Sequence, residues 1–329
     1  MAEFAERDAL ARLIGTAGRR TLPPEEDYQR TLVACRATWQ RAVRQRARRR
    51  WGYALAAAAL IGVFGAGILR MSGQGPVVMG TLSRAEGGVF AASPASGEWH
   101  WLTTPGVQML SGTRLRTDTS GGAAVNLGAD NSLRLGASTD LLLNAGRRVE
   151  LIAGRVYFDA RGRGGDGIEI VTRFGTLRDT GTQFEVLATD SELRVRTREG
   201  AVTLTPSDHG AVLTCAFSEE LRVDTYGRVQ RGRIAPHDPQ WSWAEALAQP
   251  PRGTQLPLRQ FLEWVVRESG RRLRYDSPDT EARVGRVMLH GTTPNLAPVK
   301  ALEVTLATTD IDFVLLDDGT ILLRTRQTR

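Results

Sequence analysis

Few residues of this chain have the types and the spacing that chemistry requires. Residues 162–167, Gly-Arg-Gly-Gly-Asp-Gly, match the G-x-G-x-x-G pattern whose glycines let a backbone approach a dinucleotide. Such a site needs a helix to begin after the glycines, whereas residues 168–172 form a strand pattern, so we predict a hairpin loop. No serine lies in a nucleophile elbow, and the histidines have no metal-ligand spacing, standing at His100, His209, His237 and His290. The sequence therefore predicts no enzyme, no metal site and no cofactor.

The most prominent element is an uncharged apolar run at residues 52–69. At 1.5 Å per helical residue it spans about 27 Å, close to the hydrocarbon thickness of a bilayer. Six arginines stand among residues 41–50, directly before the run, and basic residues stay on the cytoplasmic side. We predict one transmembrane helix at residues 51–71 with the N-terminus in the cytoplasm. A cleaved signal peptide fits less well, because about fifty residues precede the run and no small-residue cleavage site follows it.

The positive charge of the chain is concentrated before this run. The formal net charge is +7, and residues 1–50 hold twelve arginines against six acidic residues. The rest of the chain is close to neutral, so the basic character predicts contact with the lipid bilayer and no direct binding of nucleic acid. Cys35 and Cys215 lie on opposite sides of the predicted membrane helix, which excludes a disulfide between them. Cys215 lies in a predicted strand and is expected to be a small buried hydrophobe.

Residues 1–50 are predicted to be helical, and a short apolar stripe from Phe4 to Ala17 indicates the first helix. Pro23-Pro24 followed by three acidic residues is a typical helix start, and an apolar stripe with Leu32 and Trp39 follows it. Two amphipathic helices of this size cannot enclose a core of their own. Their apolar faces either pair with each other, lie on the membrane surface or bind a cytoplasmic protein.

Beyond the apolar run, residues 72–240 change to a period of two, which indicates strands. The predicted strands are residues 88–92, 99–102, 113–117, 123–127, 132–135, 140–143, 149–152, 155–159, 168–173, 177–179, 183–187, 193–197, 201–205, 210–214 and 221–225. Glycine, asparagine and aspartate lie at the turns between them. The pattern predicts an all-β domain, and a sandwich, a roll and a short β-solenoid all fit it.

Residues 241–329 are predicted to form a small α+β module. Apolar residues from Leu258 to Val266 follow helical spacing, and Gly270 ends that helix. Strands at 272–275 and 284–289, a second helix at 298–307 and a hairpin at 313–324 complete it. The expected fold is membrane-anchored and mainly β, with four parts: the inner helical segment 1–50, the membrane helix 51–71, the β domain 72–240 and the module 241–329.

Several of these motifs resemble a known family. Residues 110–117 (Leu-Ser-Gly-Thr-Arg-Leu-Arg-Thr), 148–158, 170–186 (Ile-Val-Thr-Arg-Phe-Gly-Thr-Leu-Arg-Asp-Thr-Gly-Thr-Gln-Phe-Glu-Val) and 193–202 resemble the FecR periplasmic domain. We expect the motif residues to be structural, with Gly175, Gly181 and Gly200 in turns or close approaches and with Phe184, Val186, Val195 and Val202 in the core. Residues 256–273 and 293–306 resemble the secretin/TonB short N-terminal (STN) module.

The resemblance implies a function. FecR-like proteins are single-pass regulators of the bacterial inner membrane with periplasmic C-terminal domains, and they transmit an envelope signal to an extracytoplasmic-function sigma factor, as anti-sigma factors do. The sigma factor would contact Leu32 and Trp39. A TonB-dependent transducer or another envelope protein would contact the terminal module, with Phe261 and Trp264 as candidate residues. The alternative is a membrane-anchored periplasmic scaffold that binds an envelope protein or a cell-wall polymer and has no role in transcription.

Overall fold

The computed structural model describes residue 26 and residues 77–128, 131–160, 167–179, 181–208, 210–291 and 295–326. The chain divides into two compact units, residues 1–75 and residues 76–329. Within the described residues, no helix has the length and apolar character needed to cross a membrane. The predicted membrane helix and the predicted contacts Leu32 and Trp39 lie outside the described residues.

The described part of the chain is mainly β, as predicted, and residues 78–233 form the β domain. The first of its two sheets contains, in spatial order, β4 (Gln108–Leu110), β1 (Val78–Glu86), β6 (Gly122–Leu127), β7 (Asn131–Leu135), β9 (Arg148–Ala160), β12 (Gln183–Ala188), β13 (Glu192–Glu199), β16 (Glu219–Asp224) and β17 (Val229–Arg233). The second contains β3 (Trp99–Trp101), β2 (Val89–Ala92), β5 (Thr113–Thr117), β8 (Asp140–Asn144), β9 again, β10 (Glu169–Thr172), β11 (Gly175–Asp179), β14 (Ala201–Pro206) and β15 (Leu213–Ala216).

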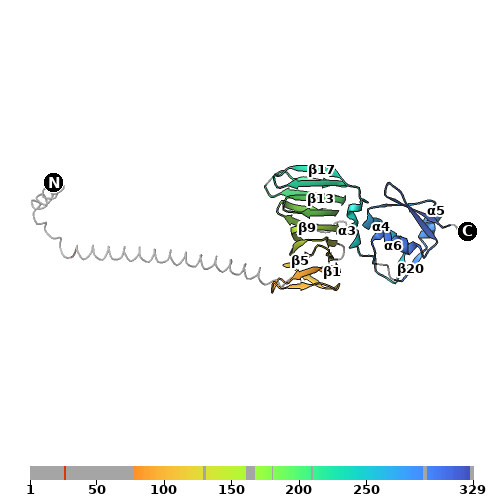
Figure 1. Cartoon of the computed structure of the whole chain (residues 1–329), viewed down its shortest axis with the longest axis horizontal. Coiled ribbons are helices and arrows are strands. Elements are labelled where there is room, and N and C mark those ends of the chain that lie inside the picture. The colour runs from red at the N-terminus through yellow and green to blue at the C-terminus, as the bar shows by residue number, and fades with distance from the viewer. Residues whose placement is uncertain are drawn as a thin grey trace, which may run out of the picture. The chain divides into compact units, whose positions relative to one another are not determined.

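The chain advances steadily along this pair of sheets. Early strands lie at one end and late strands at the other, as the colours from β1 and β5 through β9 and β13 to β17 show (Figure 1). Neighbouring strands are antiparallel except β9 and β10, which are parallel. Inward-facing side chains of both sheets form one hydrophobic core. Of the alternatives that the sequence left open, the structure thus combines the two facing sheets of a sandwich with the stepwise progress of a solenoid.

Strand β9 belongs to both sheets, where the sequence predicted two separate strands. Its first half pairs with β8 and β10, and its second half pairs with β7 and β12. Gly154 lies at the crossover with φ +93°, and a Cβ atom there would be 2.4 Å from the Cα of Thr139. Glycine therefore lets the strand bend from one sheet into the other without ending.

Most predicted strands are confirmed within a few residues, and the misses have local causes. The sequence did not predict β1, β4 or β17; β4 has three residues, and every residue of β17 is exposed, so neither has a full alternating pattern. The strand predicted at 210–214 lies instead at Leu213–Ala216. Of the predicted hairpin loop, residues 161–166 lie outside the described residues, and the strand expected after it is β10.

The roles expected for the motif residues are confirmed. Gly175, Gly181 and Gly200 have φ angles of +147°, +91° and +76°. At Gly175 a Cβ would lie 2.3 Å from the carbonyl oxygen of Thr205, so this position also needs the absence of a side chain. The four apolar residues expected in the core are at most 1% exposed: Phe184, Val186, Val195 and Val202. Cys215 is also buried.

Residues 255–325 form the C-terminal module, which has its own hydrophobic core. Its elements are β18 (Gln255–Pro257), α4 (Leu258–Ser269), β19 (Arg272–Tyr275), α5 (Pro278–Val284), β20 (Met288–His290), α6 (Pro298–Leu306), β21 (Ile311–Leu315) and β22 (Thr320–Thr325). Strands β18 and β20 form one small sheet, and β19, β22 and β21 form another. The predicted α4 is confirmed, and Gly270 ends it in the left-handed conformation.

One prediction in the module is wrong. Residues 284–289 were expected to be a strand, but α5 occupies the segment up to Val284, and β20 begins only at Met288. The helix starts where the hydroxyl of Ser277 accepts a hydrogen bond from the backbone N–H of Thr280, with Pro278 at its first position. Both are helix-start signals that are visible in the sequence.

Candidate functional site

The outer face of the first sheet carries a row of polar side chains across five neighbouring strands. Arg134, Tyr157, Glu185, Arg196 and Glu220 stand directly opposite one another on β7, β9, β12, β13 and β16. Alternate residues of a strand point to opposite faces, so most neighbours of these five residues along each strand belong to the apolar core. The folding pattern thus gathers charged groups on one face.

The charges in this row alternate and pair. Nε of Arg196 donates to Glu220 at 2.5 Å, and its Nη1 lies 3.6 Å from Oε1 of Glu185. Glu185 also accepts hydrogen bonds from Arg194 at 3.1 Å and from the indole N–H of Trp243 at 2.8 Å. The Arg134 guanidinium lies over the Tyr157 ring, 5.2 Å from its centre. Opposite charges across neighbouring strands stabilise the sheet and hold this face in one arrangement.

A segment that we call the strap, residues 234–249, covers this row. It contains the short 3-10 helix η1 (Pro239–Trp241) and helix α3 (Ser242–Ala246), and it leads from the end of β17 back toward β1. Its contacts follow the sheet in reverse order: Pro236 with Arg198 of β13, Trp241 with Tyr157 of β9, Ala244 with Arg134 of β7, Leu247 near Gly122 of β6 and Ala248 with Arg84 of β1. The strap therefore crosses the outer face strand by strand.

At the centre, a buried ion pair joins the β domain to the C-terminal module. Nη2 of Arg134 lies 2.7 Å from Oε2 of Glu268 on α4, and the two side chains are 1% and 0% exposed. Asp159 lies 3.8 Å from the same nitrogen, and Nη1 donates to the carbonyl oxygen of Ala244 at 2.9 Å. Burial lowers the pKa of Arg134, but the carboxylates of Glu268 and Asp159 outweigh it, and the net pKa is above its ordinary value. Arg134 is therefore a charged residue inside the protein.

Two further arginines complete this contact, which we call the junction. Arg198 donates to the carbonyl oxygens of Pro236 at 2.6 Å and Glu268 at 2.8 Å, and it pairs with Glu245 at 2.6 Å. Arg267 of α4 pairs with Asp159, which is 0% exposed. The junction thus links sheet, strap and module through arginines that each bridge at least two partners.

Glycine and tyrosine at the junction show how closely it is packed. At Gly270 a Cβ would lie 2.1 Å from the carbonyl oxygen of Pro236, so the residue that ends α4 also admits the strap. Burial raises the pKa of Tyr157 to about 12, with the charges around it as smaller causes, so its phenol is neutral at physiological pH. The Tyr157 and Trp241 rings meet edge to face at 5.9 Å.

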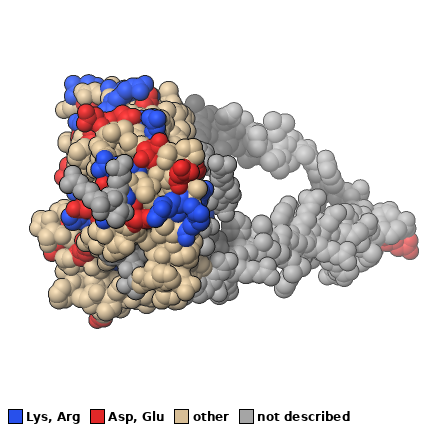
Figure 2. Space-filling view, turned by 90° about the vertical axis from the view of Figure 1, so that its right-hand side faces the viewer, with Lys and Arg blue, Asp and Glu red and all other residues tan. Residues whose placement is uncertain are grey.

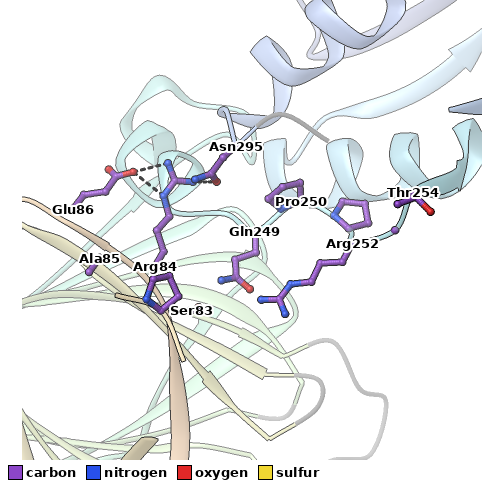
Figure 3. A pocket seen from close by; sticks show the side chains of 12 residues that line it. Ser83, Arg84, Ala85, Glu86, Gln249, Pro250, Arg252, Thr254 and Asn295 are labelled. Atoms are coloured by element: carbon purple, nitrogen blue, oxygen red, sulfur yellow. Dashed lines mark hydrogen bonds and ion pairs between the residues drawn. The ribbon is translucent and has the colours of Figure 1, made fainter. Parts of the chain in front are cut away.

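An open pocket of about 480 Å³ lies at one end of the strap, between β1 and residues 249–254 (Figure 3). In it, Arg84 turns toward Glu86 and Asn295, with distances of 2.6 Å from Nε to the glutamate and 2.6 Å from Nη1 to the asparagine carbonyl. Asn295 belongs to the C-terminal module, so this contact is a second, partly exposed link between module and β domain. The pocket is lined by the end of β1 and by loop residues, and two of its charged residues, Arg84 and Glu86, pair with each other.

The side chains of the junction are suited to connecting the β domain to the C-terminal module. In the part of the chain that the structure describes, no group of three or more histidine, cysteine, aspartate or glutamate side chains could hold a metal ion. The acids and bases of the junction pair with each other, and the side chains of Arg134, Asp159 and Glu268 are buried, whereas Arg267 at the rim is partly exposed. On the surface, basic and acidic side chains are interspersed over the face that Figure 2 presents. The arrangement can fix two bodies relative to each other.

The sequence-predicted contact residues of the module lie in its interior. Phe261 is 0% exposed and Trp264 is 7% exposed, and their rings are 5.6 Å apart in the core. They hold α4 against the rest of the module, so a protein that binds the module in this form reaches other residues first. The junction itself was missed, although Glu268 gave a signal: it follows Phe261 by seven residues on the apolar stripe of α4, which predicts a buried carboxylate in need of a cation.

Comparisons with known proteins place the β domain in context. Residues 113–203 match the family described as FecR protein. No curated protein matches the chain. Two crystal structures of a proposed anti-sigma factor from Parabacteroides distasonis, at 2.50 and 1.65 Å, are similar with 18% and 19% identity. Each similarity covers 64% of this chain and 98% of the other, with a TM-score of 0.35. The matched family segment runs from β5 into β14, so the similarity to this family lies within the β domain.

Proposed function

We propose that this protein is a single-pass regulator of the bacterial inner membrane, of the anti-sigma-factor type. Residues 1–50 bind an extracytoplasmic-function sigma factor in the cytoplasm, residues 51–71 cross the membrane, and the FecR domain and the module lie in the periplasm. An envelope protein such as a TonB-dependent transducer binds the outer part and supplies the signal. The observation that carries this proposal is the match to the FecR family at residues 113–203, which follows an arginine-rich segment and an uncharged apolar run.

The junction supports a signalling role for the outer part. The module and the β domain share a buried ion pair and the strap, so a protein that binds the module also acts on the sheet to which it is fixed. Function in this proposal is protein–protein recognition, without a catalytic step, a cofactor or nucleic-acid contact by this chain. The STN-like character of the module is part of the proposal.

On the outer side, we place the envelope partner at the module's groove between β20 and the end of α6. This groove is lined by Met288 and Val304, which are 44% and 42% exposed, together with His290 and Thr308. Exposed apolar side chains beside an edge strand are suited to contact with another protein. The groove takes the role that the sequence assigned to Phe261 and Trp264.

Co-purification of the full-length chain tests the inner contact. The chain is tagged at its C-terminus, expressed in its source cells, extracted in mild detergent and analysed by mass spectrometry for bound proteins. We expect an extracytoplasmic-function sigma factor with the wild type and its loss from the double variant Leu32→Asp, Trp39→Asp. The matched control is Ala34→Asp, Ala37→Asp, which puts the same charges on the opposite face of the predicted helix and should keep the sigma factor.

Two outcomes would contradict the proposal. If the wild type recovers no sigma factor while the chain is intact in the membrane fraction, the scaffold alternative replaces it. If both double variants lose the sigma factor equally, Leu32 and Trp39 do not define the contact face. Orientation is checked separately by adding protease to spheroplasts, which should digest the outer part and spare residues 1–50.

A further inference from the structure

Several large apolar side chains are exposed at the end of the β domain where the chain enters it. Trp101 is 65% exposed and Trp99 is 40% exposed, both on β3, which is an edge strand of the second sheet. Val77 and Val78, at the start of β1, are each 48% exposed. We call Val77, Val78, Trp99 and Trp101 the N-terminal edge. Exposing tryptophan rings to water on an edge strand is energetically unfavourable. We therefore expect another surface to cover the N-terminal edge.

The strand order places these residues at one end of the domain. Val78 pairs with Leu110 of β4, the terminal strand of the first sheet, and β3 is the terminal strand of the second sheet. Trp99 and Trp101 are two residues apart on β3 and therefore point to the same face. The exposed aromatic rings, the exposed valines and the first described residue of the outer unit thus share the N-terminal end of the stack.

The length of the connecting segment decides what lies beside this end. Residues 72–76 are all that separates the predicted membrane helix from Val77. Six steps along the chain reach at most about 20 Å even when fully extended. The polar interface of a bilayer is itself roughly 5–8 Å thick on each side. The N-terminal edge is therefore held within a short distance of the lipid headgroups if the chain is anchored as proposed.

We propose that the N-terminal edge rests on the outer surface of the bilayer, with Trp99 and Trp101 in the headgroup region. Tryptophan prefers this region because its ring is apolar and its N–H finds hydrogen-bond partners there. The inference rests on the proposed function, since it needs the membrane helix at residues 51–71. It fixes the FecR domain against the membrane that the signal must cross.

Charge contributes little to this contact. Arg116 lies over the ring of Trp99 at 4.6 Å, but Arg114 and Arg116 both pair with Asp140, and Glu98 precedes the ring on the chain. Positive and negative groups are therefore in balance at the edge. Binding should come from the aromatic rings and should not need anionic lipid.

Quenching of tryptophan fluorescence by brominated phosphatidylcholine tests the proposal. The full-length chain is incorporated into nanodiscs whose lipids carry bromine close to the headgroup. We expect the quenched emission to fall by about half or more in Trp99→Phe, Trp101→Phe, because rings at the membrane interface are within reach of the bromines. The matched control Trp264→Phe removes a ring from the module core and should leave the quenched emission unchanged. Adding phosphatidylglycerol should change neither result.

A third variant separates the two hypotheses. Trp51 stands at the predicted membrane boundary, so Trp51→Phe should lower the quenched emission whenever the chain is anchored as proposed. If Trp51 is quenched and the Trp99, Trp101 pair is not, the docking inference is overturned and the anchoring stands. The docking inference is also overturned if the pair is shielded from both bromolipid and aqueous iodide, since another protein or a second copy then covers it. A chain that does not enter the nanodiscs overturns both.

Discussion

Replacing Glu268 by glutamine should strongly destabilise the compact unit formed by residues 76–329. The change removes the charge that pairs with the fully buried guanidinium of Arg134 at 2.7 Å and keeps the size of the side chain. Leaving one buried charge without its partner costs about 3–5 kcal/mol. Asp159 remains 3.8 Å from the same nitrogen and compensates in part, so we expect the low end of that range, about 3 kcal/mol of the free energy of unfolding.

The assay is urea unfolding of residues 76–329, which form one compact unit. Tryptophan fluorescence reports on the junction, because Trp241 is fully buried there. For a unit of this size, a loss of about 3 kcal/mol corresponds to a fall in melting temperature of roughly 6–12 °C. The single variants Arg134→Met and Glu268→Leu and their double variant complete a mutant cycle. The double variant should be more stable than the sum of the single losses predicts, by about 2 kcal/mol, because two apolar side chains leave no unpaired charge.

The control is an exposed pair of the same kind. Lys300 and Glu303 are 2.6 Å apart on α6, but their side chains are 61% and 59% exposed. Water already solvates both charges, so Glu303→Gln should change the free energy of unfolding by less than about 0.5 kcal/mol. The reasoning is refuted if the two single junction variants add within about 0.5 kcal/mol, or if Glu268→Gln behaves like the control.

Three other predictions use the same unit. Burial raises the pKa of Tyr157 to about 12, so the phenol ionises at lower pH in the unfolded chain than in the folded one. The free energy of unfolding should therefore fall as the pH rises above about 10. In urea unfolding at a series of pH values, Tyr157→Phe should show a smaller fall than the wild type. Gly154→Ala should lower the free energy of unfolding by several kcal/mol, because the new Cβ would meet the Thr139 backbone. Gly146→Ala, with open space around the new Cβ and φ +74°, should lower it by about 1–2 kcal/mol, as measured by thermal unfolding. Cys215 is buried, and burial raises the pKa of its thiol, so it should react with a thiol reagent much more slowly in the folded unit than in urea, and equal rates would contradict its burial.

Local sequence patterns predicted most of the secondary structure. Alternation predicted strands such as β5 and β14 because one of their faces is buried in the core, and helical spacing predicted α4 for the same reason. Alternation of apolar and polar residues cannot indicate a strand whose residues are not alternately buried and exposed. Strand β17 is exposed throughout, and β9 passes from one sheet to the other at Gly154, so a single strand looks like two in the sequence.

The junction could be predicted only in part. Glu268 on the apolar stripe of α4 indicated a buried carboxylate, but its partner Arg134 is one of many strand arginines with the same local pattern. Which arginine reaches Glu268 depends on the path of the strap and on the register of five strands, and neither is a property of a short sequence window. Phe261 and Trp264 were assigned to a partner because large aromatic residues suit both interfaces and cores, and spacing alone does not separate the two uses.

The strap has a consequence for the order in which the protein can be completed during synthesis. Arg134 is part of a strand that emerges early, yet its main carboxylate partner follows 134 residues later in the chain. Until the strap and α4 have emerged, the outer face of the first sheet lacks its cover and Arg134 lacks the carboxylate of Glu268. The outer face of the first sheet therefore reaches its final form only when nearly the whole chain has been synthesised, and a product truncated before α4 would leave Arg134 without its main carboxylate partner.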